Sequence, residues 1–119
     1  VDKRVAFMVP KDGERIEGVA GETWARQACV LVEDLPDLAQ NKAKKNMADY
    51  AKKSFLPKSW LDLHQGTSRS LYGIPLEVEN QKWGVIILDS RHDKFVGRDH
   101  ADNFHRIFSK TLGKLISKL

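Results

Sequence analysis

The segment SLYGIPLEVENQKWGVIILDS, residues 70–90, constrains the fold more than any other part of the sequence. Two apolar runs flank a short polar joint, which is the pattern of a β-hairpin. A strand with one exposed face should alternate apolar and polar residues, but residues 83–88 are apolar without a break. We therefore predict a hairpin that is covered on both faces.

The totals fit one folded domain of ordinary composition. The chain has 119 residues, of which 41% are hydrophobic and 30% are charged, and its formal net charge is +4. A chain of this length builds one core rather than two, so we expect a single domain over residues 1–119. The one cysteine, Cys29, excludes an internal disulfide and fits a reducing, cytoplasmic compartment.

The start of the chain also carries information. No apolar run reaches the roughly 20 residues that span a bilayer, and no signal peptide opens the sequence. Because the first residue is Val1 and a strand pattern begins almost at once, we expect a domain excised from a longer chain. Contact with a membrane would then come only through a missing flanking segment.

The rest of the pattern alternates short strands with helices. Residues 4–9 and 14–20 predict an N-terminal hairpin, and residues 28–33 predict a further buried strand. Helix formers dominate residues 22–27 and 37–53. An apolar stripe predicts a C-terminal amphipathic helix, and its members are Phe104, Ile107, Phe108, Leu112, Leu115, Ile116 and Leu119.

These elements predict an α+β fold. Its central antiparallel sheet would have about five strands, with helices on both faces. The segment 37–65 would cover one face of the sheet, and the C-terminal helix would cover the other.

Three stretches, taken in order, resemble the GAF domain, a small sensory module related to PAS domains. GVAGETWARQACVLVEDLP (18–36) is similar to the family's glycine-led short helix and the strand that follows it. SRSLYGIPLEVENQKWGVIILDS (68–90) is similar to its central hairpin, and KF…D (94–99) to its ending. The resemblance implies a GAF-like fold without the family's usual N-terminal helix, and a ligand pocket between the sheet and segment 37–65.

The match to the cyclic-nucleotide-binding members of that family is incomplete. Those members close the last central strand with Asn-Lys, followed by Phe, three residues and Asp-Glu. Here Phe95 and Asp99 fit, whereas Asp89, Ser90 and His100 replace the Asn, Lys and Glu. Without the lysine–aspartate pair we expect no tight binding of a cyclic nucleotide. Asp99 would instead cap the last helix.

The residues of the family's enzymes are also missing. The free methionine sulfoxide reductases of this family need more than one cysteine, and Cys29 lies within ACVLV, where it is typical of a small buried hydrophobe. His100 and His105 are five residues apart, and no Cys/His cluster indicates zinc or haem. No nucleophile–base pair or paired-carboxylate motif is recognisable, so we expect no enzymatic activity and no metal.

The implied pocket would be lined by aromatic and polar side chains. Indole and phenol rings suit the stacking of a heterocycle, and guanidinium groups suit a phosphate or carboxylate. The candidate ligand-binding residues are Trp24, Arg26, Tyr50, Phe55, Trp60, His64, Arg69 and Asp89. The alternative is that the aromatic rings simply fill the cavity. The identity of any cofactor stays open.

The predicted function follows from this resemblance and from the charge pattern. The region 42–58 is rich in lysine, but it lacks interleaved arginine and aromatic residues, which argues against direct binding of DNA or RNA. We expect a cytoplasmic, bacterial sensory domain that binds a small anionic or nucleotide-like molecule and signals to a fused or associated partner. It would form a homodimer through helical segments. The alternative is a ligand-free dimerisation or interaction module.

Overall fold

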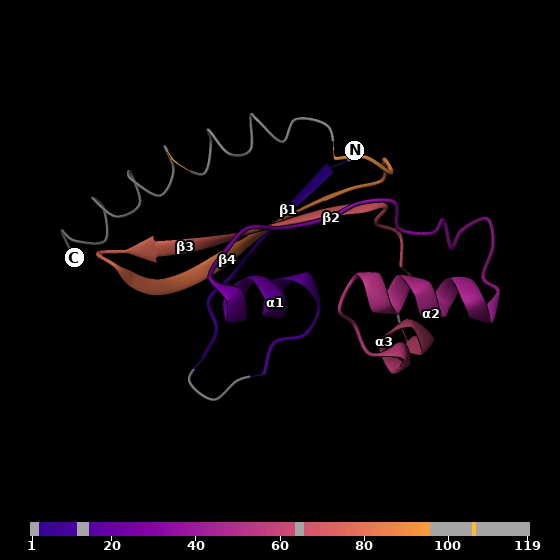
Figure 1. The fold of residues 1–119 in the computed structure, drawn as a ribbon, viewed down its shortest axis with the longest axis horizontal. Helices are drawn as coiled ribbons and strands as arrows, with labels where there is room; N and C mark the ends of the chain where they lie inside the picture. Colours follow the sequence, from indigo (N-terminus) through magenta and orange to yellow (C-terminus); the bar gives the residue numbers. More distant parts are fainter. Residues whose placement is uncertain (1–2, 12–14, 64–65, 96–105, 107–119) are drawn as a thin grey trace.

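The computed structural model describes residues 3–11, 15–63, 66–95 and 106. Within these ranges an antiparallel sheet is packed against three helices (Figure 1). The elements in chain order are β1 (Lys3–Met8), α1 (Gly18–Arg26), β2 (Val30–Val32), α2 (Lys44–Lys53), α3 (Lys58–Leu63), β3 (Ser70–Val78) and β4 (Gln81–Ser90).

The four described strands form one sheet in the order β1-β4-β3-β2, with every neighbouring pair antiparallel. β3 and β4 are the central pair, and they confirm the hairpin predicted for residues 70–90. Glu79 and Asn80 form its two-residue connection, with φ angles of 52° and 64°. A turn with two left-handed residues matches the twist of the flanking strands, so the connection fixes the register of the hairpin.

Both faces of the central pair are buried, as the unbroken apolar run predicts. Val85 and Ile86 are neighbours in β4 and are 0% and 3% exposed. One core cluster combines strand and helix residues, and its buried members are Val19, Val30, Val32, Leu35, Leu38, Tyr50, Ala51 and Leu61. The second cluster has Tyr72, Ile74, Leu76, Ile86 and Phe95 as its buried members.

Helix α1 packs directly on β2, β3 and β4. Gly73 in β3 permits the approach, because a Cβ at this position would overlap Oγ1 of Thr23 and lie 3.0 Å from Cγ1 of Val19. The Thr23 hydroxyl donates to the Val19 carbonyl at 2.7 Å, so the polar group buried under the sheet is satisfied. The close contact of α1 with β3 therefore depends on the missing side chain at position 73.

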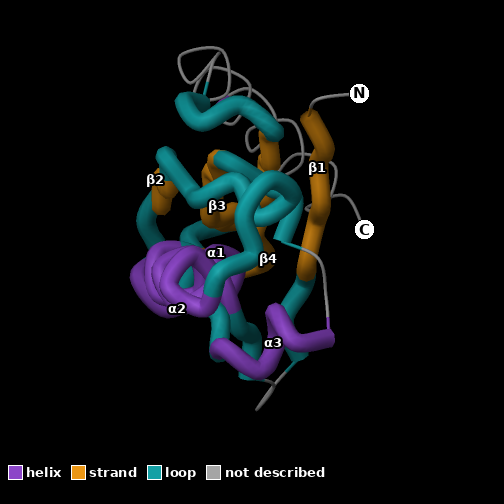
Figure 2. The backbone as a smooth tube through the Cα atoms, turned by 90° about the vertical axis from the view of Figure 1, so that its right-hand side faces the viewer, coloured by secondary structure: helices purple, strands orange, loops and turns teal. Residues whose placement is uncertain are grey.

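Helices α2 and α3 lie toward the end of the strands, beyond α1 (Figure 1). Figure 2 shows the three helices gathered toward one side of the sheet. Tyr50, Ala51 and Leu61 bring α2 and α3 into the core cluster that α1 shares with the strands. The face that segment 37–65 was predicted to cover is thus covered mainly by α1, and α2 and α3 extend the same core.

The predicted second strand of an N-terminal hairpin, residues 14–20, is wrong. Gly18, Val19 and Ala20 begin α1, which also extends the helix predicted over residues 22–27. Val19 and Ala20 are adjacent and both buried; a strand would place them on opposite faces, whereas a helix keeps both near the core. The described sheet therefore has four strands instead of about five. The α+β class with an antiparallel sheet is confirmed.

The helix predicted from residue 37 begins later, at Lys44. Asp37 Oδ1 accepts a hydrogen bond from the N–H of Ala39 at 3.1 Å, and Asn41 Oδ1 accepts one from the N–H of Ala43 at 3.0 Å. Such side-chain bonds to nearby backbone groups compete with helix formation and favour turns. The 37–43 connection is therefore a loop.

Two further predictions concern residues outside the described ranges. The predicted C-terminal helix lies outside the described residues apart from Arg106, and Asp99 lies outside them too. None of the helices that can be inspected is long and apolar enough to pass through a bilayer.

We predict that Gly73→Ala destabilises the fold by about 1–3 kcal/mol, the usual cost of overpacking a core. The added methyl group would push α1 away from β3 at Thr23. Urea unfolding measures the change, and Thr23→Ala in the same background should recover part of the loss. A G73A protein as stable as the parent would contradict this packing, and so would a double variant without recovery.

Candidate functional site

A cavity of about 290 Å³ lies where the 37–43 connection, α2, α3 and the residues before β3 meet. This volume is close to the lower end of the range for small-molecule sites, about 300–1,000 Å³. The described residues that line it are Leu38, Ala39, Lys42, Met47, Leu61, Gly66 and Thr67. Leu38 and Leu61 are buried, whereas Ala39, Lys42 and Thr67 are more exposed. The cavity thus has an apolar floor and a more polar rim.

Tyr50 in α2 supports the wall of the cavity that Gly66 and Thr67 form, through a bond to the next residue, Ser68. Its hydroxyl donates to the Ser68 carbonyl at 2.9 Å, and its side chain is almost fully buried. Gly66 lies against its ring, because a Cβ at Gly66 would be 2.9 Å from Cζ of Tyr50 and 3.1 Å from Cδ1 of Leu38. A side chain at position 66 would therefore displace either the ring or the leucine.

Arg69 joins the two sides of the cavity through the backbone. Its Nε donates to the Leu35 carbonyl at 2.7 Å, and the Leu35 N–H donates to the Arg69 carbonyl at 3.0 Å. One guanidinium nitrogen also lies 3.9 Å from Oδ2 of Asp37. These contacts tie the start of the 37–43 connection to the residues before β3. A role for Arg69 as a donor to an anionic ligand stays a prediction.

Asp89 lies in β4, opposite Leu71 of β3 and Arg4 of β1. Its charge acts on Tyr50: burial raises the pKa of Tyr50 to about 12, and the negative Asp89 adds to the rise while the Ser68 hydrogen bond opposes it. The structure thus brings two of the predicted ligand residues, Tyr50 and Asp89, close enough to interact.

Four of the predicted residues make other contacts. Arg26 in α1 lies over the ring of Phe55, 5.5 Å from its centroid. Trp24, also in α1, meets Lys82 of β4, whose ammonium is 5.7 Å from the indole centroid. Trp60 in α3 packs against the first core cluster. The eighth predicted residue, at position 64, lies outside the described residues.

None of the eight predicted ligand residues is among the described residues that line the cavity. Two signals in the sequence could have found the lining. Met47 shares an apolar helix face with Tyr50, and Lys42 begins the basic region. Gly66 gave no chemical signal, because its contribution is the absence of a side chain.

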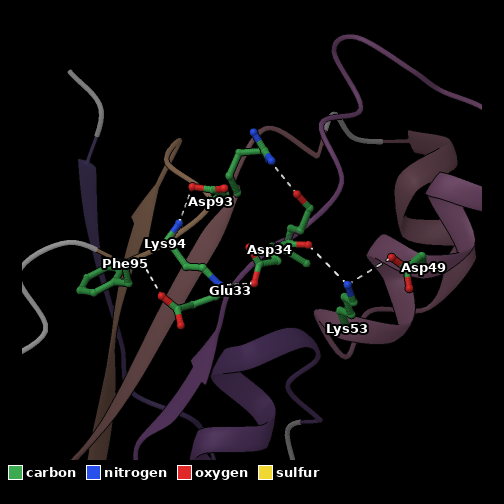
Figure 3. A network of polar contacts seen from close by, with 9 residues as sticks. Glu33, Asp34, Asp49, Lys53, Asp93, Lys94 and Phe95 are labelled. Atoms are coloured by element: carbon green, nitrogen blue, oxygen red, sulfur yellow. Dashed lines mark hydrogen bonds and ion pairs between the residues drawn. The ribbon is translucent and has the colours of Figure 1, made fainter.

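A polar network centred on Asp34 joins the end of β2 to α2 and to the loop after β4 (Figure 3). Its carboxylate accepts a hydrogen bond from Lys94 at 2.5 Å, and its carbonyl accepts one from Lys53 at 3.4 Å. Its N–H donates to the Asp93 carbonyl at 2.8 Å. The bond with Asp34 raises the pKa of Lys94. Asp34 has a φ of 58°, a conformation that aspartate adopts more readily than most residues.

Glu33, beside Asp34, holds the next residue of that loop. Its Oε2 accepts a hydrogen bond from the N–H of Phe95 at 2.7 Å. Phe95 is 8% exposed, and its ring meets that of Tyr72 edge-on at 5.6 Å between centroids. The network therefore fixes the loop onto the second core cluster, and it contributes no side chain to the described lining of the cavity.

Cys29 is exposed, so the interpretation of this residue as a buried hydrophobe is wrong. It precedes β2 at the end of the β2–β3 ladder where Val30 faces Gly73. The cavity residues Gly66 and Thr67 lie beyond the opposite end of that ladder, before β3 begins. The single thiol is therefore not part of the cavity. Within the part of the chain that the structure describes, no group of three or more His, Cys, Asp or Glu residues could hold a metal ion.

Of three comparisons with known proteins, only the one with solved structures gives a match. No family model and no curated protein matches the chain. Among solved structures, the fold is similar to the X-ray structure of free methionine-R-sulfoxide reductase from Neisseria meningitidis in complex with its substrate, with a TM-score of 0.52 and 20% sequence identity. The match covers 92% of this chain and 64% of that chain, so this chain spans less than two thirds of that protein's length. At this identity the likeness shows the fold.

This likeness corrects the predicted function. The expectation of no enzymatic activity is contradicted, because the similar structure is that of an enzyme with its substrate bound. The same finding contradicts a sensory, signal-transducing domain and its alternative, a ligand-free dimerisation module. The number of cysteines bears only on a mechanism that uses several thiols of the protein itself, and one fold can host many activities.

We predict that stability falls at alkaline pH through Tyr50. Its pKa rises from 10.0 to about 12 on folding, so its contribution is fully present below pH 10 and is lost as the pH rises through about 12. A rise of this size corresponds to about 3 kcal/mol of stability.

Urea unfolding of the parent and of Tyr50→Phe over this pH range measures that contribution. The phenylalanine variant should be about 1 kcal/mol less stable at neutral pH, because it lacks the hydrogen bond to Ser68. It should then lose less stability than the parent as the pH rises. Parallel losses in the two proteins would contradict the assignment.

Proposed function

We propose that this chain is the substrate-binding part of an enzyme that acts on a small, amino-acid-sized molecule, with free methionine sulfoxide as the first substrate to test. The observation that carries the proposal is the cavity of about 290 Å³ with its apolar floor and polar rim. A molecule of about ten non-hydrogen atoms, apolar at one end and charged at the other, matches this division.

One likeness supports an enzymatic function for this cavity, and a second supports a pocket for a small molecule. The solved structure with a similar fold is named as a free methionine-R-sulfoxide reductase in complex with its substrate, so small-molecule chemistry is compatible with the fold. The sequence resemblance to the GAF domain, with its small-molecule pocket, points the same way. We assign the fold to the GAF-like class on these grounds.

Reduction of a sulfoxide to a thioether needs two electrons, and the oxygen leaves as water. Two thiols supply the electrons and end as a disulfide. Cys29 is the only thiol in the chain, and it lies at the end of β2 away from the cavity. In this proposal the chain binds and orients the sulfoxide, and an external dithiol supplies the electrons.

The test is to incubate the protein with free methionine sulfoxide and dithiothreitol and to measure methionine by amino-acid analysis. We expect methionine to form faster than with dithiothreitol alone. Heat-unfolded protein gives the background. A rate no higher than this background would contradict the proposed reaction.

A matched variant, Cys29→Ser, tests the role given to the external thiol. It should keep the activity of the parent, because the serine replaces an exposed group outside the cavity. Loss of activity in C29S would show that Cys29 takes part in the reaction and would contradict the external source of electrons.

A further inference from the structure

Resting on the proposal that the cavity is the substrate site, we propose that it selects its ligand as a carboxylate with an aliphatic chain. The carboxylate would bind at Lys42 and the chain would lie on Leu38, Met47 and Leu61. An ammonium group on the ligand would not strengthen binding. This names a class of substrate to which methionine sulfoxide belongs through its carboxylate and its carbon chain.

The charge of the lining supports a carboxylate. Lys42 is the only charged side chain among the described lining residues, and no aspartate or glutamate is among them. A ligand ammonium would therefore meet a like charge at the rim and no described carboxylate to pair with it. Lys42 is exposed, so its contribution is moderate and depends on salt.

The floor of the cavity supports an apolar chain on the ligand. Leu38 and Leu61 are 5% and 6% exposed, so both are held within the core cluster, and Met47 packs against the same cluster. Methionine has a flexible, polarisable thioether that fits itself to an aliphatic chain. The floor therefore offers apolar contact to the carbon chain of a ligand.

The probes are hexanoate and hexylamine, titrated into protein labelled with 13C at the methionine methyl groups. The chain has two methionines: Met47 lines the cavity, and Met8 lies on β1 as an internal control. We expect hexanoate to shift the Met47 signal and leave Met8 unchanged. Hexylamine should bind about fivefold more weakly, because its ammonium meets the like charge of Lys42.

Two variants locate the charge. Lys42→Met should weaken hexanoate binding about two- to fivefold, the usual effect of an exposed ion pair. Lys45→Met removes an exposed lysine of α2 that is not among the described lining residues and should have little effect. Equal effects of the two variants would mean that hexanoate is attracted by the net positive charge of the protein and not by Lys42 in particular. That result would contradict the inference. Stronger binding of hexylamine than of hexanoate would also contradict it.

The two proposals can fail separately. Formation of methionine from its sulfoxide without any hexanoate shift at Met47 would overturn this inference and leave the proposed reaction standing. A hexanoate shift at Met47 without formation of methionine would support the selectivity and overturn the reaction.

Discussion

Burial of the β3–β4 hairpin on both faces is the constraint on which the rest of the structure depends. A strand pair that is apolar on both faces cannot stay in water, so each face needs its own core cluster. The three helices of the first cluster do not cover the sheet equally. α1 lies close against β3 at Gly73, and α2 and α3 are left to pack around the end of the strands. The cavity lies at this end of the sheet, between α2, α3, the 37–43 connection and the residues before β3.

Support for the cavity comes from side chains that do not line it. Tyr50 holds residues 66–68 through a carbonyl, and Arg69 holds Leu35 through both a side-chain and a main-chain bond. Polar groups of this kind are stabilising when their partners are fixed, because an unpaired buried group is costly. The walls thus belong to the folded core, and a ligand would find them largely formed.

How far the sequence could predict this structure depended on the kind of signal, and the site was harder to predict than the fold. The hairpin was predictable because an unbroken apolar run of this length between turn residues fits few structures except a strand buried on both faces. The strand predicted over residues 14–20 failed because adjacent apolar residues such as Val19 and Ala20 fit a helix as well, and only the position of the sheet decides. Tyr50 and Arg69 have side chains whose chemistry suits a ligand, yet they support the walls of the cavity. The lining includes Gly66, whose role depends on three-dimensional packing. A single sequence shows which groups can bind a ligand, and it does not show where they point.

The exposure of Cys29 has a practical consequence for work with this protein. A lone surface thiol beside an edge strand of the described sheet can form a disulfide only with another molecule, and air oxidation would then join two chains covalently. Such a species would run as a dimer in any sizing experiment without reductant, although no natural contact held it together. The same thiol accepts a maleimide dye at one known place, away from the cavity, which makes the native chain ready for single-site labelling.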